Sequence, residues 1–170
     1  MLGDRLFVTL QTGKQPGACR LRIGHRLQRG KGLRCDDKQC FLGIEIEPVD
    51  EAAPAELPPT VMCAGVTLKG EWYGGVLLAY PWALADQAAR LALGVDNASL
   101  DDMRDVVGEI VNMMTGRLKY YMPGKTEMSL PIVATGDTLG IAIPGSREVM
   151  SLDFHIEGVP FRLQVVCTDA

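Results

Sequence analysis

The residues best suited to chemistry lie in the middle of the chain, where Asp105, Glu109 and Asn112 are spaced by four and three positions. On a helix that turns by about 100° per residue, these side chains fall within a stripe about 60° wide. The apolar residues of the same segment lie on the other side, so we expect the stripe to face solvent or a partner. A carboxylate binds a cationic group. An amide can donate and accept hydrogen bonds at once, which suits it to orienting a water molecule.

Two glycines, Gly108 and Gly116, flank this stripe. A glycine lowers the surface of a helix, so the backbone or a phosphate group of a partner can approach closely, although each glycine costs about 1 kcal/mol relative to alanine. The shape therefore indicates a docking surface. A plainer alternative stays open, because any surface helix carries polar residues opposite its apolar side.

The segment that carries the stripe has clear helix signals at both ends. Ser99 and Asp102 form an acidic variant of the capping box, which predicts that the helix begins at Leu100. Pro123 and Gly124 predict that it stops after about 22 residues. The residues predicted to face the core are Met103, Val106, Val107, Ile110, Met113, Met114, Leu118 and Tyr121.

Other elements are predicted on both sides of this helix. Two apolar runs, 61–68 and 73–80, flank a short turn and predict a hairpin, in which Gly65, Gly74 and Gly75 suggest close packing. A first helix is expected to begin at Pro81 and end at Gly94, with a buried stripe of Leu84, Ala85, Ala88, Leu91 and Ala92. Strands are predicted at 128–134, 139–143, 149–156 and 159–167, the last two joined by a two-residue turn, Glu157 and Gly158. This order predicts an α+β domain of two layers, with an antiparallel sheet and two long helices packed on one face.

Composition separates the start of the chain from the rest. Residues 1–40 carry nine Lys/Arg against three Asp/Glu, a net +6, while residues 41–170 carry eight against eighteen, a net −10. We therefore expect a basic and poorly ordered amino-terminal segment at 1–40 and a compact domain at 41–170. A nucleic-acid role for the basic segment is a weaker alternative, because the segment lacks interleaved aromatic residues and a binding motif.

Several classes of protein are disfavoured by sequence. No apolar run reaches the 18 or so residues that a membrane helix needs, and the five cysteines are odd in number and widely spaced, so we expect a cytoplasmic protein with free thiols. His25, Cys35 and Cys40 do not have the spacing of a structural metal site, and no metal site is expected in this chain. The chain has no phosphate-binding loop, no nucleophile elbow and no zinc-protease motif, and His155 is interpreted as a structural strand residue.

The run from Asp105 to Gly116 resembles the D-x3-E-x2-N signature, with its flanking glycines, of the CheX and CheC chemotaxis phosphatases. The segments 68–70, 75–81 and 129–131, with Gly136, are similar to the hairpin, the strand-to-helix junction and the later strand of that family. The resemblance covers about residues 41–168, and the single copy of the motif makes the chain CheX-like. The sequence differs from the family pattern in two places. Residues 1–40 lack the periodicity of the amphipathic first helix that such proteins usually have, and Arg117 stands where a second asparagine is often found.

This resemblance implies an activity and a partner. Asn112 would place a water molecule in line with the aspartyl phosphate of a CheY-like response regulator, and Glu109 would bind the lysine of that regulator. Asp105, Gly108 and Gly116 would contact the partner. The regulator would supply Mg²⁺, so that this chain binds no cofactor itself, and family members commonly form homodimers. A non-catalytic module that binds a regulator or a flagellar switch component is the alternative.

Overall fold

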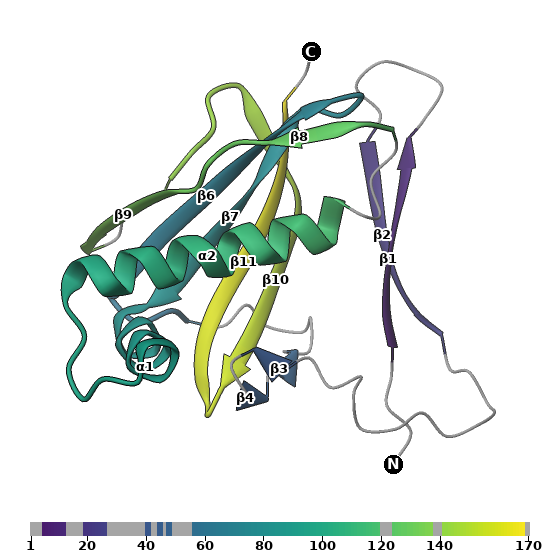
Figure 1. Ribbon diagram of the computed structural model, residues 1–170. Helices are drawn as coiled ribbons and strands as arrows, with labels where there is room; N and C mark the ends of the chain where they lie inside the picture. The colour runs from purple at the N-terminus through teal and green to yellow at the C-terminus, as the bar shows by residue number, and fades with distance from the viewer. Residues whose placement is uncertain are drawn as a thin grey trace.

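A computed structural model of the protein describes residues 56–119, 124–137 and 141–168, together with the backbone of five strands nearer the amino terminus (Figure 1). These are β1 (Arg5–Thr12), β2 (Cys19–Arg26), β3 (Cys40–Phe41), β4 (Ile44–Glu45) and β5 (Glu47–Pro48). β1 and β2 pair antiparallel, with Arg5 opposite Arg26 and Thr12 opposite Cys19. The proposed domain boundary at residue 41 stays a prediction, because most of residues 1–55 lie outside the described part.

Two long hairpins make the centre of the main sheet. β6 (Thr60–Gly70) pairs with β7 (Gly74–Pro81), and β10 (Ser146–Ile156) pairs with β11 (Val159–Thr168), as the sequence predicts. The second hairpin turns at Glu157 and Gly158, whose φ angles are 50° and 80°. Positive φ at both positions matches the right-handed twist of the flanking strands, and this explains the two-residue turn.

The sheet is antiparallel throughout, in the order β5-β10-β11-β7-β6, and β11 lies inside it. Beyond β6 the edge is shared by two short strands, β8 (Thr126–Met128) and β9 (Ile132–Asp137), which pair with opposite ends of β6. The single strand predicted at 128–134 is therefore two strands with a break at residues 129–131.

Both helices lie on one face of this sheet, with α2 crossing the strands (Figure 1). α1 (Trp82–Leu93) follows Pro81 directly, and it ends where Gly94 adopts the left-handed conformation (φ 66°) and its N–H donates to the Arg90 carbonyl at 2.9 Å. α2 (Leu100–Lys119) begins at the predicted residue. The observed architecture is thus the predicted α+β fold of two layers.

The buried stripe predicted for α1 is partly wrong. Leu84, Ala85 and Ala88 are buried, together with Ala89, but Leu91 and Ala92 are exposed. The last turn of the helix and the residues that follow it extend beyond the core, and residues 90–97 are all exposed.

The core fills the space between the sheet and the helices, and residues 141–143 cover part of the other face of the sheet. There Ile141 comes within 3.6 Å of the position that a Cβ on Gly65 would take, and Ile143 contacts the equivalent position on Gly75. The strand predicted at 139–143 is not present over 141–143, because these residues pack across the sheet instead of pairing in it. The central residues of the core are Met62, Val66, Val76, Leu78, Tyr80, Val107, Val111, Phe161 and Val165. No helix in the described part of the chain is both long enough and apolar enough to cross a membrane.

Candidate functional site

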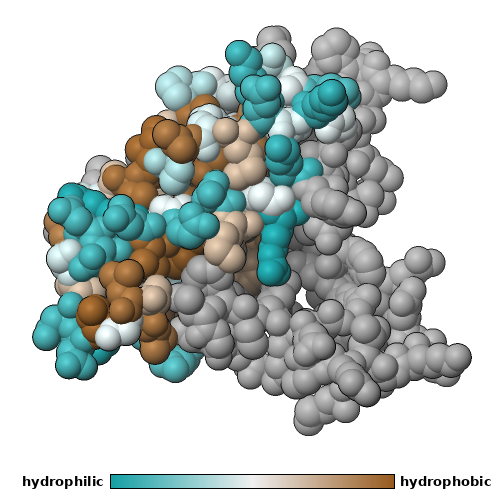
Figure 2. Space-filling model, in the orientation of Figure 1, coloured by the Kyte–Doolittle hydropathy of each residue, from teal (hydrophilic) through white to brown (hydrophobic). Residues whose placement is uncertain are grey.

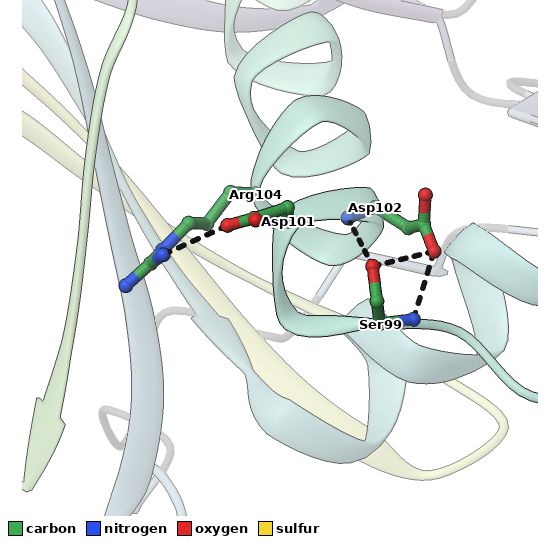
Figure 3. Close-up of polar contacts among 4 residues, drawn as sticks. All are labelled: Ser99, Asp101, Asp102 and Arg104. Atoms are coloured by element: carbon green, nitrogen blue, oxygen red, sulfur yellow. Dashed lines mark hydrogen bonds and ion pairs between the residues drawn. The ribbon is translucent and has the colours of Figure 1, made fainter.

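The first turn of α2 is fixed by the predicted capping box (Figure 3). The Asp102 N–H donates to Ser99 Oγ at 3.1 Å, and the N–H and hydroxyl of Ser99 donate to Asp102 Oδ2 at 2.8 and 2.7 Å. These hydrogen bonds hold the pKa of Asp102 below its ordinary value, because they favour the charged carboxylate. The cap sets where the helix begins and therefore which residues face outward along it.

The outward face of α2 carries the stripe that the sequence predicts. Asp105 and Glu109 are exposed, Asn112 is half-buried, and Gly116 is exposed, with no side chain of the described residues within 4 Å of where its Cβ would stand. Within the described residues, the side chains of Asp105, Glu109 and Asn112 make no hydrogen bond or ion pair. The acid and the amide are available to an external group, while their chemical roles stay predictions.

Gly108 does not lie on that open surface. It is buried, and a Cβ built on it would lie 3.4 Å from Val133 Cγ2 and 3.5 Å from Pro131 Cγ. The expectation that Gly108 leaves room for a partner is therefore corrected. Pro131, just before β9, and Val133, within β9, fill that space at distances that would be ordinary van der Waals contacts for an added Cβ.

The buried side of α2 is also rotated from the predicted one. Met113 is 40% exposed, whereas Val111 and Thr115 are fully buried at 0%. Thr115 can lie in the core because its hydroxyl donates to the Val111 carbonyl at 2.6 Å. Gly108, Val111 and Thr115 follow a helical spacing of three and four residues, and this second stripe is the signal that could have revealed the contact with the edge of the sheet. Val106 and Met114 are partly buried, and Tyr121 lies outside the described residues.

The segment between β8 and β9 is anchored to β6 by a serine. The Ser129 N–H donates to the Thr67 carbonyl at 3.0 Å, and the Thr67 N–H donates to Ser129 Oγ at 3.0 Å. A side chain thus replaces a backbone acceptor at the point where the edge strand breaks. The arrangement keeps Pro131 seated on Gly108.

Carboxylates dominate the charge of the outward face. Asp101, Asp105 and Glu109 succeed each other at intervals of four, and like charges at this spacing destabilise a helix by about 0.2–0.5 kcal/mol per pair. Arg104 pairs with Asp101 at 3.0 Å (Figure 3). Asp105 and Glu109 have no such partner in the described part of the chain. Figure 2 shows a hydrophilic row along α2, beside hydrophobic surface near the edge of the sheet.

Other side chains that could take part in chemistry lie away from the outward face of α2. Cys63 and Cys167 are buried, and burial raises the pKa of the Cys63 thiol. His155 is half-buried on β10, opposite Pro160. The described residues contain no group of three or more His, Cys, Asp or Glu that could hold a metal ion. His25, Cys35 and Cys40 lie in the part of the chain whose side chains are not described.

Comparison with known families decides the relationship. The family model for chemotaxis phosphatase CheX matches residues 62–155, which is more than half of the chain and includes the whole of α2. The chain belongs to the CheX family. No curated protein matches it significantly.

Solved structures of CheX proteins share the fold. The chemotaxis protein CheX from Desulfovibrio desulfuricans aligns with a TM-score of 0.59 at 21% identity, over 73% of this chain and 86% of that one. CheX from Vibrio vulnificus aligns with a TM-score of 0.59 at 20% identity, over 74% and 84%. A CheX from Borrelia burgdorferi, crystallised as a CheX-CheY-BeF3-Mg²⁺ complex, aligns with a TM-score of 0.54 at 15% identity, over 74% and 84%.

Proposed function

We propose that this chain hydrolyses the aspartyl phosphate of a CheY-like response regulator. The observation that carries the proposal is that exposed Glu109 and half-buried Asn112 lie together on the outward face of α2, in a chain that belongs to the CheX family. The Borrelia burgdorferi relative forms a complex with CheY, and this supports a regulator of that kind as the partner.

Asn112 is the proposed catalytic residue. Its amide oxygen accepts a hydrogen bond from a water molecule while its N–H₂ group donates to a phosphoryl oxygen. A neutral amide does this without repelling the anionic phosphoryl group. A second carboxylate at this position would repel it. Because phosphoryl transfer depends largely on positioning and electrostatics, a fixed water in line with the phosphorus is a sufficient contribution from this side.

Glu109 is the proposed anchor for the lysine of the regulator. Its exposed carboxylate has no cation partner among the described residues, so a charge-assisted hydrogen bond to an ammonium group can form without breaking another. The complex would also relieve the repulsion between Glu109 and Asp105. Asp105 and Gly116 are proposed as further contacts with the partner, and Mg²⁺ is proposed to be held by the regulator.

The experiment is to load a CheY-like receiver domain with phosphate and follow its decay with wild type and variants. Glu109→Ala and Asn112→Ala are expected to slow the stimulated decay by about a hundredfold or more, since loss of positioning has effects of this size. Glu127→Ala and Asn97→Ala are matched controls, because both residues are exposed and lie off α2. Decay that is equally fast with Glu109→Ala, Asn112→Ala and wild type would contradict the proposal. Binding to the loaded receiver without faster decay would favour a non-catalytic module.

We also propose that the protein acts as a homodimer in the cytoplasm. β9 pairs only with β6 among the described strands, so its outer edge has backbone groups that a second copy could pair with. Sedimentation at several concentrations tests this proposal. A monomer at micromolar concentration would contradict it.

A further inference from the structure

The edge of the sheet beside α2 contains a bulge with an exposed leucine. Leu68 faces Met128 in β8 and Gly65 faces Ile132 in β9, so β6 contributes residues 66 and 67 between these pairs while the edge strand contributes 129, 130 and 131. Ser129 occupies the place opposite Thr67 through its two hydrogen bonds. Leu130 and Pro131 therefore share the place opposite Val66, as two residues do in a β-bulge.

This bulge faces the helix side of the sheet. Val66 belongs to the core beneath the helices, and Pro131 rests on Gly108 of α2. Leu130 is 86% exposed, the largest exposure of any large hydrophobic side chain in the described residues. Gly108 lies one turn before Asn112 on the same helix, so the Leu130–Pro131 bulge borders the half of the stripe that carries the amide.

The residues on both sides of Leu130 are anchored to the rest of the domain. Ser129 ties the preceding residue to β6, and Pro131 fixes the following one through its ring and its contact with α2. Because the flanking residues are already anchored, a partner that covers Leu130 needs to order only its side chain, which makes it an efficient contact for binding. Its neighbours Ser129, Pro131 and Ile132 are uncharged, so the spot is apolar beside an acidic helix.

We propose that Leu130 is an apolar anchor for the receiver domain and determines affinity without taking part in the chemistry. This inference rests on the proposed function. It specifies the partner surface as one that presents a cationic side chain to Glu109 and, next to it, an apolar side chain to Leu130. The bulge is continuous with the stripe on α2, so a receiver domain that covers Asn112 must also pass over Leu130. We therefore infer that the receiver domain is the protein that covers this leucine.

Ile132 supplies a matched control two residues away. It is 65% exposed, but it faces Gly65, whose Cβ position meets Ile141 on the other face of the sheet. Val133, the next residue, points the opposite way, toward Gly108. Ile132 is thus an exposed hydrophobic residue on the same edge that faces away from the proposed contact.

The test compares Leu130→Thr and Ile132→Thr in dephosphorylation of a CheY-like receiver at varied receiver concentration. We expect Leu130→Thr to raise KM about tenfold with kcat within twofold of wild type, since loss of a buried apolar contact has about this effect. Ile132→Thr is expected to leave both constants unchanged. Equal KM values for the two variants, or a fall in kcat alone for Leu130→Thr, would overturn the inference.

A binding measurement separates this inference from the proposed function. The receiver, loaded with beryllium fluoride and Mg²⁺, is titrated with wild type and both variants. If wild type binds it but does not accelerate phosphate loss, the proposed hydrolysis fails, and about tenfold weaker binding of Leu130→Thr still supports the anchor. If wild type accelerates the loss and Leu130→Thr binds as tightly as wild type, only the anchor fails. A change in self-association by Leu130→Thr with unchanged receiver affinity would assign the leucine to a second copy and overturn the proposal.

Discussion

Gly116 lies one helical turn beyond Asn112 on the exposed side of α2, and apart from the adjoining helix backbone no atom of the described residues lies within 4 Å of the position that its Cβ would take. Packing among the described residues therefore gives no reason for a glycine here, although glycine weakens a helix. The bare backbone next to the amide is the feature that a closely approaching partner would use.

Gly116→Ala should separate stability from activity. We expect the free energy of unfolding to rise by about 1 kcal/mol, because alanine is the better helix former. We expect KM for the phosphorylated receiver to rise by about tenfold, as a misfit of about 1.4 kcal/mol would produce. Urea unfolding and receiver decay measure the two effects. A stabilised variant with the KM of wild type would show that Gly116 is not part of the contact.

Removing the cap should weaken α2 from its start. Ser99→Ala is expected to lower the free energy of unfolding by about 1 kcal/mol, because the side chain no longer accepts the Asp102 N–H. Ser151→Ala, an exposed serine on β10, is the matched control. Urea unfolding at pH 7 checks the difference, and equal losses in the two variants would contradict a capping role.

The same cap predicts a dependence on acid. The hydrogen bonds from Ser99 lower the pKa of Asp102, so the folded state binds its proton less readily than the unfolded state does. This contribution is present above the ordinary carboxyl pKa of about 4 and is lost as the pH falls below it. Unfolding curves of wild type and Asp102→Asn should therefore converge as the pH falls from 6 to 3. A constant gap over that range would argue against the assignment.

Tyr80 should make the fold sensitive to alkali. Burial raises the pKa of Tyr80 to about 12, and its ring packs edge-on against Phe161 with the centroids 5.4 Å apart. Because the folded pKa is raised above the ordinary value of about 10, this contribution is complete below pH 10 and is lost between pH 10 and 12, by about 3 kcal/mol. Tyr80→Phe keeps the ring and removes the titration, so it should lose less stability between pH 9 and 11.5. Parallel losses in both proteins would contradict the prediction.

Gly74 should tolerate no side chain. A Cβ at this position would overlap the Val166 carbonyl oxygen and the ring of Trp72. The strands β7 and β11 would have to separate, and we expect Gly74→Ala to lower the free energy of unfolding by about 3 kcal/mol. Gly116→Ala serves as the comparison, since the same substitution in open space should stabilise. Thermal unfolding of the two variants shows whether each substitution stabilises or destabilises the protein.

The parts of the fold that sequence predicts are those with local causes. Glu157 and Gly158 specify a two-residue turn by themselves, Ser99 and Asp102 specify where α2 begins, and Gly94 ends α1. Each of these signals acts within a few residues, so no knowledge of the rest of the molecule is needed.

The parts that sequence misses depend on distant contacts. The rotation of α2 follows from the edge segment lying on Gly108, and the break at 129–131 follows from Ser129 bonding to Thr67 across the sheet. Sequence alone would place the polar Thr115 on the surface, but its hydrogen bond to the Val111 carbonyl allows it to be buried. The stripe of Asp105, Glu109 and Asn112 was predictable because its placement depends only on helical period and on the mean direction of the core.

The interior position of β11 has a consequence for how the protein is made. β11 joins β7, some 80 residues earlier in the chain, to β10, so the sheet cannot close until residues 159–168 have left the ribosome. Until then β7 exposes an unpaired, hydrophobic strand edge to solvent, which is the kind of surface that chaperones bind and from which aggregates form. Folding of this sheet is therefore expected to depend on β11 more than on α2.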